Sequence, residues 1–106
     1  MKRRFNLSYN TNEVLVSVGG SEAIDACMRA VIEPGDEVII PQPSYVCYEP
    51  ITQLVGGVPV IIETLAENDF KVTPEQLKNA ISKKTKALIS RTGCTCTEMN
   101  AFAHFN

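Results

Sequence analysis

Residues 14–40 read VLVSVGGSEAIDACMRAVIEPGDEVII, and this stretch decides the expected fold. Two aliphatic runs, Val14–Val18 and Glu37–Ile40, show little alternation between apolar and polar residues, which is typical of strands covered on both faces. Between them, Ser21–Ile32 carries apolar residues at helical spacing and ends at a Pro-Gly-Asp turn. The stretch therefore predicts a strand, a helix and a second strand. The helical residues expected to face the core are Ala23, Ile24, Cys27, Met28, Val31 and Ile32.

The same order of aliphatic runs and helical segments continues towards residue 90. Val58–Ile62 and Lys86–Ser90 predict two further strands. Pro50 begins a short predicted helix that ends at the glycine pair of residues 56 and 57. Thr73-Pro74-Glu75-Gln76 is a capping box with proline at the first helical position, so a third helix is expected to follow it. The inward residues of that helix are expected to be Leu77, Ala80 and Ile81.

Strands that alternate with helices in this way predict an α/β fold. We expect a mostly parallel sheet of about four strands with three crossover helices and right-handed crossovers. The 106 residues, 44% of them apolar, fit a single domain. We place this domain at residues 1–90.

Residues 91–106 read RTGCTCTEMNAFAHFN and differ in character from the rest of the chain. They show no strong period, so we interpret them as an atypical tail that is foreign to the domain. A frameshift and disorder are two interpretations of this segment.

Composition excludes several classes of function. The formal net charge of -2 gives no basic face for a nucleic acid, and no stretch approaches membrane-spanning length. Without an apolar signal segment near the start, the chain is expected in the cytoplasm with its four cysteines reduced. Neither a nucleic acid nor a membrane is therefore expected as a partner.

The glycine pair at residues 19 and 20 lies between a predicted strand and a predicted helix. With Ser21 as the expected N-cap, this turn exposes backbone N–H groups at a helix N-terminus, where a phosphate is favoured. Glycine for turn geometry alone is the other interpretation, with Glu22 and Asp25 satisfying the helix dipole. Tyr45 follows the next strand and could stack on a flat ligand or simply cover the sheet edge.

Together these residues resemble the class I and II pyridoxal-phosphate aminotransferases, which share the aspartate-aminotransferase-like fold. The resemblance covers about residues 5–90, through VLVSVGGSEAIDACMRAVIEPGDEVIIPQPSYVCYEPI and VIIETLAENDFKVTPEQLKNAISKKTKALIS. It implies that Gly20, Ser21 and Glu22 contact the phosphate of pyridoxal 5′-phosphate, mostly through backbone N–H groups. It also implies that Tyr45 stacks on the pyridine ring, and that the chain is part of the large, cofactor-binding domain.

Several family features are absent from this sequence. After a strand like Ala87–Ser90 the family reads approximately N-N-P-T-G, whereas this chain reads RTGC at residues 91–94. The cofactor-binding lysine, the aspartate beside the pyridine nitrogen and the arginine for a substrate carboxylate are also missing. We therefore expect a fragment of an enzyme that transfers an amino group between an amino acid and a 2-oxo acid, inactive alone and with weak or no cofactor binding. No catalytic residue is assigned. The lysines interpreted as solvated surface charges, and not as the cofactor-binding lysine, are Lys71, Lys78, Lys83, Lys84 and Lys86.

The resemblance also implies that the usual neighbours of the strand at Val14–Val18 are encoded after Ser90. An unpaired buried strand leaves backbone groups unsatisfied, so this strand is expected either to pair with Ala87–Ser90 or to borrow an edge from another chain. A homo-oligomer held by unpaired strand edges is one consequence.

Two alternative functions remain. Cys94, Cys96 and His104, with Cys27 or Cys47, could form a thiolate and imidazole metal site, although the C-x-C spacing is not the usual one. A small, non-catalytic interaction module that kept the scaffold is the other alternative.

Overall fold

The computed structural model of the chain describes residues 8–91 and 101–105. Its strands are β1 (Glu37–Gln42), β2 (Val58–Glu63), β3 (Thr85–Arg91) and β4 (Ala101–Phe105). Its helices are α2 (Gly19–Val31), α3 (Tyr48–Leu54) and α4 (Pro74–Ala80), with the short 3-10 helices η1 (Thr11–Glu13) and η2 (Ala66–Asn68). The α/β fold expected from the sequence is confirmed.

The four strands form one sheet in the order β2-β1-β3-β4. β1 pairs in parallel with β2 on one side and with β3 on the other. β4 adds to β3 in the antiparallel direction. Because parallel neighbours need a crossover, α3 and α4 lie in the connections on either side of β2.

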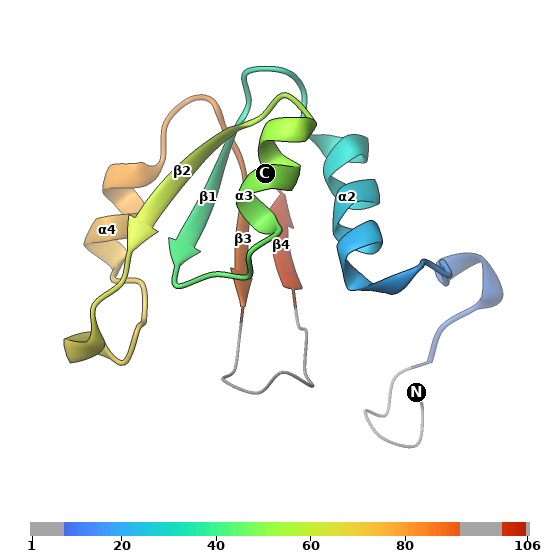
Figure 1. Cartoon of the computed structure of the whole chain (residues 1–106), viewed down its shortest axis with the longest axis horizontal. Helices are drawn as coiled ribbons and strands as arrows, with labels where there is room; N and C mark the ends of the chain where they lie inside the picture. Colours follow the sequence, from blue (N-terminus) through green and yellow to red (C-terminus); the bar gives the residue numbers. More distant parts are fainter. Residues whose placement is uncertain (1–7, 92–100, 106) are drawn as a thin grey trace.

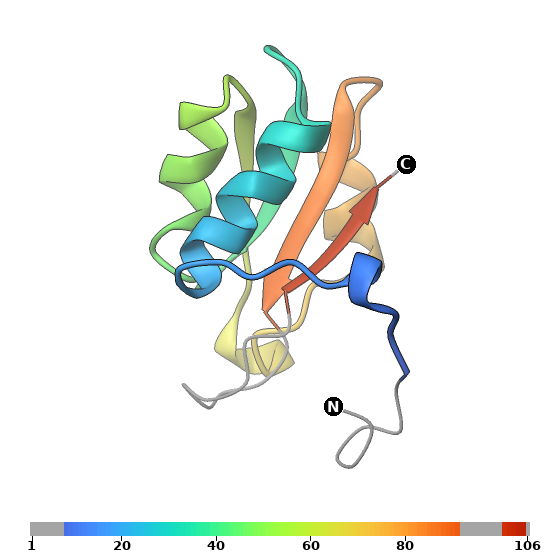
Figure 2. The same ribbon diagram turned by 90° about the vertical axis from the view of Figure 1, so that its right-hand side faces the viewer.

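Helices cover both faces of the sheet (Figures 1 and 2). α2 and α3 lie on one face, and α4 lies on the other. Side chains alternate along a strand, so Val38 and Ile40 point towards α2 and α3, whereas Ile39 points towards α4. This burial on both faces explains why β1 reads as a continuous aliphatic run. The main core cluster is Ile24, Met28, Ile32, Val38, Ile40, Tyr48, Ile51, Ala87 and Ile89.

The capping box predicted at Thr73 is confirmed at the start of α4. The Thr73 hydroxyl accepts a hydrogen bond from the Gln76 backbone N–H, and the Gln76 side chain accepts one from the Thr73 N–H. α4 ends at Ala80, one residue before the expected Ile81, which is exposed. The inward position predicted for Ile81 is therefore wrong.

The starts of two helices differ from the prediction. α2 begins at Gly19, with Val18 as the N-cap, so the prediction of Ser21 as the N-cap is wrong. Cys27, expected to face the core, is exposed on the outer side of this helix. α3 begins at Tyr48, two residues before Pro50.

The segment Val14–Val18 is not a strand, which corrects the sequence-based prediction. It is extended at Val14 but pairs with none of the described strands, and Figure 1 shows it leading away from the sheet. Leu15 and Val16 are 80% and 91% exposed. A strand forms only with a hydrogen-bonding partner, so aliphatic composition alone did not make one here.

On the side of β3 away from β1 lies β4, from the segment interpreted as a tail. The register joins Ala87 to Phe105 and Arg91 to Ala101. This pairing occupies the edge of β3, so the expectation that Val14–Val18 pairs with Ala87–Ser90 is wrong. Within the described part of the chain, no helix is both long and apolar enough to cross a membrane.

Candidate functional site

The candidate site lies at the edge of the sheet where β1, β2 and β3 end. These strands run in one direction, so their carboxyl ends share an edge, and Figure 1 places the N-terminus of α2 at that same edge. In open α/β sheets, ligands bind outside the carboxyl ends of the strands. The topology therefore brings the glycine turn and the loop after β1 to one end of the molecule.

Gly19 gives the turn its shape. Its φ of +84° lies in the left-handed region, which a side chain would disfavour, and this angle lets the chain enter α2 directly from Val18. The Ser17 hydroxyl donates a hydrogen bond of 3.0 Å to the carbonyl oxygen of Gly19. Val18 provides no side-chain cap, so the first backbone N–H groups of α2 point out of the helix end.

Acidic side chains already interact at and near this helix end. The Glu22 carboxylate accepts a hydrogen bond from the Val18 backbone N–H. Asp25 accepts one of 2.8 Å from the Arg29 side chain, four residues later on α2. This hydrogen bond, together with the charge of Asp25, raises the pKa of Arg29 above its usual value. Glu22 thus supports part of the alternative interpretation, in which acidic side chains and not a ligand interact with the positive end of the helix dipole.

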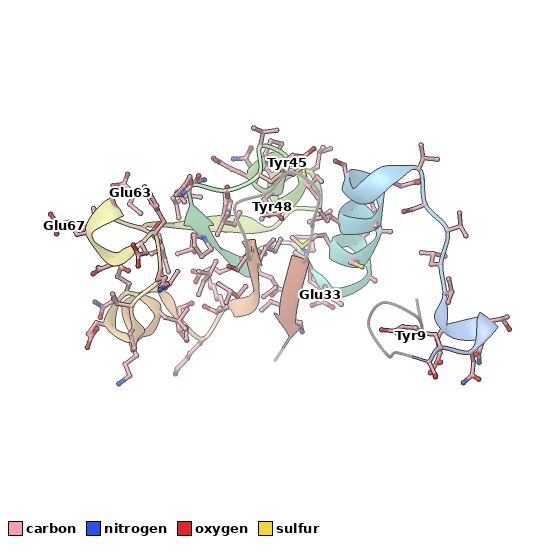
Figure 3. All side chains as sticks on the ribbon, turned by 90° about the horizontal axis from the view of Figure 1, so that it is seen from below. Tyr9, Glu33, Tyr45, Tyr48, Glu63 and Glu67 are labelled. Atoms are coloured by element: carbon pink, nitrogen blue, oxygen red, sulfur yellow. The ribbon has the colours of Figure 1, made fainter. Side chains whose placement is uncertain are left out.

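Tyr45 lies in the loop between β1 and α3. Gln42, at the end of β1, turns this loop by accepting a hydrogen bond of 3.0 Å from the Ser44 N–H. The Tyr45 ring meets the buried Tyr48 ring edge-on, with centroids 5.8 Å apart and planes at 68°. Figure 3, viewed from below, shows both tyrosines between the end of β1 and α2. Tyr45 is 37% exposed, so one part of its ring covers the core and another part faces solvent.

Gly20, Ser21 and Glu22 lie in the first turn of α2, and this end of the helix and Tyr45 lie at the same end of the sheet. Gly20 is half-buried, and Ser21 and Glu22 are exposed. The described lysines lie elsewhere. Lys71 follows η2, across the sheet from α2, and its ammonium is 3.6 Å from the Asp69 carboxylate. The others are Lys78 on α4, Lys83 and Lys84 in the turn before β3, and Lys86 near the start of β3.

The family model for class I and II aminotransferases matches residues 1–94. The chain belongs to the class I and II aminotransferases. This class is dependent on pyridoxal phosphate, and the sheet described above corresponds to part of its large domain.

Curated aminotransferases match most of the chain. It is 44% identical to the putative aminotransferase YugH of Bacillus subtilis, over 84% of this chain and 23% of that protein. It is 48% identical to the aspartate aminotransferase of Bacillus sp. strain YM-2, over 83% of this chain and 22% of that protein. The chain thus spans less than a quarter of the length of these aminotransferases.

Solved aminotransferase structures share the fold. A single mutant of the Thermus thermophilus aspartate aminotransferase superposes with a TM-score of 0.78 at 41% identity, covering 86% of this chain and 24% of that chain. The aspartate aminotransferase of Rhizobium meliloti gives a TM-score of 0.75 at 36% identity, covering 82% and 22%. At these identities the match supports the family as well as the fold.

The metal-site alternative is not tested by the structure. Cys94 and Cys96 lie outside the described residues, and only the backbone of His104 is described, in β4. Among the residues that the structure does describe, no group of three histidine, cysteine or acidic side chains could hold a metal ion.

Proposed function

We propose that this chain is the part of a pyridoxal-phosphate-dependent aminotransferase that holds the phosphate and one face of the ring of the cofactor. The family match over residues 1–94 carries the proposal. The meeting of the glycine turn and Tyr45 at one sheet edge supports it. The whole protein would exchange an amino group between an amino acid and a 2-oxo acid.

The residues at the edge fit the cofactor in part. The backbone N–H groups of Gly20, Ser21 and Glu22 begin α2, where donors and the positive end of the helix dipole favour a phosphate. Tyr45 offers an aromatic face at the same edge. The Glu22 carboxylate, which accepts from the Val18 N–H, opposes this by repelling an anion. Binding by this chain is therefore expected to be weak.

Holding the cofactor is not enough for transamination. The bound cofactor supplies an electron sink, and a protein lysine moves the proton between substrate and cofactor carbons. Gly20, Ser21 and Tyr45 orient the group but cannot take that proton. Because none of the described lysines lies beside the α2 end of the sheet, we propose that this chain alone does not transaminate.

Amide chemical shifts of the full chain test the proposed site. Pyridoxal 5′-phosphate, titrated to millimolar concentration, is expected to shift the amide signals of residues 20–22 and 45 with weak affinity. Pyridoxal, which lacks the phosphate, is the matched ligand and is expected to leave the signals of residues 20–22 in place. Shifts confined to residues near surface lysines would contradict the proposed phosphate site.

Turnover is tested separately. An assay with aspartate and 2-oxoglutarate is expected to show no amino transfer by this chain. Tight, stoichiometric cofactor binding, with borohydride reduction fixing the cofactor to one lysine, would overturn the proposal of inactivity. The family assignment would stand in either case.

A non-catalytic interaction module is the second candidate. It is favoured by the exposed apolar side chains of Val14, Leu15, Val16 and Val18, which the described part of the chain leaves uncovered. In this case the scaffold would bind another protein chain.

A further inference from the structure

Tyr48, the first residue of α3, packs its ring against the ring of Tyr45. Tyr48 is 3% exposed and belongs to the core cluster, whereas Tyr45 is 37% exposed. We propose that Tyr48 is a positioning residue, which holds the Tyr45 ring at the sheet edge in the orientation that stacks on the cofactor ring. The inference rests on the proposed function and adds to it a residue that acts only through Tyr45.

Hydrogen bonds fix the backbone on both sides of Tyr45 but do not involve its ring. The Ser44 N–H donates to the Gln42 side chain at 3.0 Å, and the Tyr48 N–H donates to the Tyr45 carbonyl at 3.1 Å. The first side-chain torsion of a tyrosine has three staggered wells, and packing decides which of them is occupied. The orientation of the Tyr45 ring therefore depends on the side chain that it contacts.

Tyr48 is suited to this role because its own position is fixed. Its carbonyl oxygen accepts a hydrogen bond of 2.8 Å from the hydroxyl of Thr52, which is fully buried on α3. The two rings lie next to each other in Figure 3, and their centroid distance of 5.8 Å and angle of 68° are typical of a favourable edge-to-face pair. A pair of this kind favours one relative orientation. The buried ring can thus hold one part of Tyr45 while another part stays open to a ligand.

An ordered ring loses less conformational entropy when a ligand stacks on it. Tyr48→Leu removes the aromatic ring but keeps an apolar side chain in the core. Because Tyr45 would then rotate among several wells, its ordering would have to occur on binding. The expected loss of affinity for a ligand with a pyridine ring is about two- to tenfold.

Titrations of the full chain, followed by the amide signals of residues 20–22 and 45, test this expectation. Pyridoxine 5′-phosphate is the probe, because it carries an alcohol in place of the aldehyde and does not react with surface lysines. Tyr48→Leu is expected to bind this probe more weakly than the wild type, and Tyr48→Phe, which keeps the ring, is expected to bind it equally well. Inorganic phosphate has no ring and is expected to bind all three proteins alike.

The orientation of Tyr45 is measured without any ligand. Couplings between the Hα and Hβ protons of Tyr45 report whether its side chain occupies one well or several. One well is expected in the wild type and in Tyr48→Phe, and several are expected in Tyr48→Leu. The matched control is Ile51→Val, at a buried position of the core cluster on the same helix, which is expected to keep one well.

Several results would overturn the inference. One is a Tyr45 side chain that already samples several wells in the wild type, a result that does not depend on how the variants fold. Others are loss of the single well in Ile51→Val or in Tyr48→Phe, and unchanged binding of pyridoxine 5′-phosphate by Tyr48→Leu. A wild type that binds neither probe at residues 20–22 would overturn the proposed function instead, and the couplings would still decide whether Tyr48 holds Tyr45.

Discussion

The carboxylate of Glu22 accepts a hydrogen bond from the backbone N–H of Val18, the residue at the N-cap position of α2. This contact places a negative charge at the end of the helix where an anion is favoured. The helix thus partly stabilises its own N-terminus, at the edge where the cofactor phosphate is proposed to bind. A phosphate bound at residues 20–22 would therefore lie near a negative charge.

Glu22→Gln is expected to strengthen binding of pyridoxal 5′-phosphate. Glutamine keeps an oxygen that can accept from the Val18 N–H but removes the charge that repels the phosphate. Loss of one exposed repulsion of this kind corresponds to about two- to five-fold in affinity. Equilibrium dialysis at low salt measures the change.

Glu67→Gln is the control for this prediction. Glu67 lies on η2, remote from α2 in Figure 3, and its substitution changes the net charge by the same amount. Equal tightening by both substitutions would show that only the overall charge matters, and would remove support for the phosphate site at α2.

Ile40→Val is expected to destabilise the chain more than Ile61→Val. The two isoleucines are register partners on β1 and β2, but Ile40 is 0% exposed in the core cluster and Ile61 is 41% exposed. Deleting one buried methylene costs about 1 kcal/mol, and at the half-exposed position less than about 0.5 kcal/mol. Urea denaturation at one fixed protein concentration measures both. Equal losses would contradict the placement of the core.

Most of the fold could be predicted from the sequence, because its signals are local. The runs that became β1, β2 and β3 are aliphatic and bounded by turns, and the capping box fixed the start of α4. Val14–Val18 is also mainly aliphatic, but the prediction of a strand there was wrong, because strand pairing depends on residues far away in the sequence. β4 was not predicted for the same reason, since nothing within Ala101–Phe105 indicates its partner β3.

The candidate site could be predicted less completely. The glycine turn and Tyr45 were found from their positions after two aliphatic runs, and the topology did bring them to one edge. The sequence did not reveal that the Glu22 side chain turns back to Val18. Its only signal is a glutamate in the first turn of the helix, which fits a dipole contact and a solvated charge equally well.

Asp25→Asn is expected to leave stability unchanged within measurement error. The ion pair with Arg29 is exposed, and surface pairs of this type contribute little. The pKa of Arg29 is higher in the folded chain than in the unfolded chain. The stability that the ion pair gives through Arg29 is therefore fully present at any pH below the unfolded pKa, and it is lost only in strong alkali, as the pH rises through the folded pKa. Denaturation midpoints at about pH 6 and about pH 9 check this. A clear loss in Asp25→Asn would show that the pair also stabilises the second half of α2.

Thr73→Ala is expected to lower the free energy of unfolding by about 1 kcal/mol, because it removes the acceptor for the Gln76 N–H. Thr73→Ser keeps a hydroxyl and is expected to stay within about 0.5 kcal/mol of the wild type. The Gln76 side chain also bonds to the Glu63 carbonyl, so loss of the cap loosens the contact that covers the end of β2. Faster exchange of the Thr73 amide, which donates to Gln76 at 3.0 Å, is therefore expected in the alanine variant alone. Unchanged exchange there would show that Gln76 is held by its bond to β2 and not by the capping box.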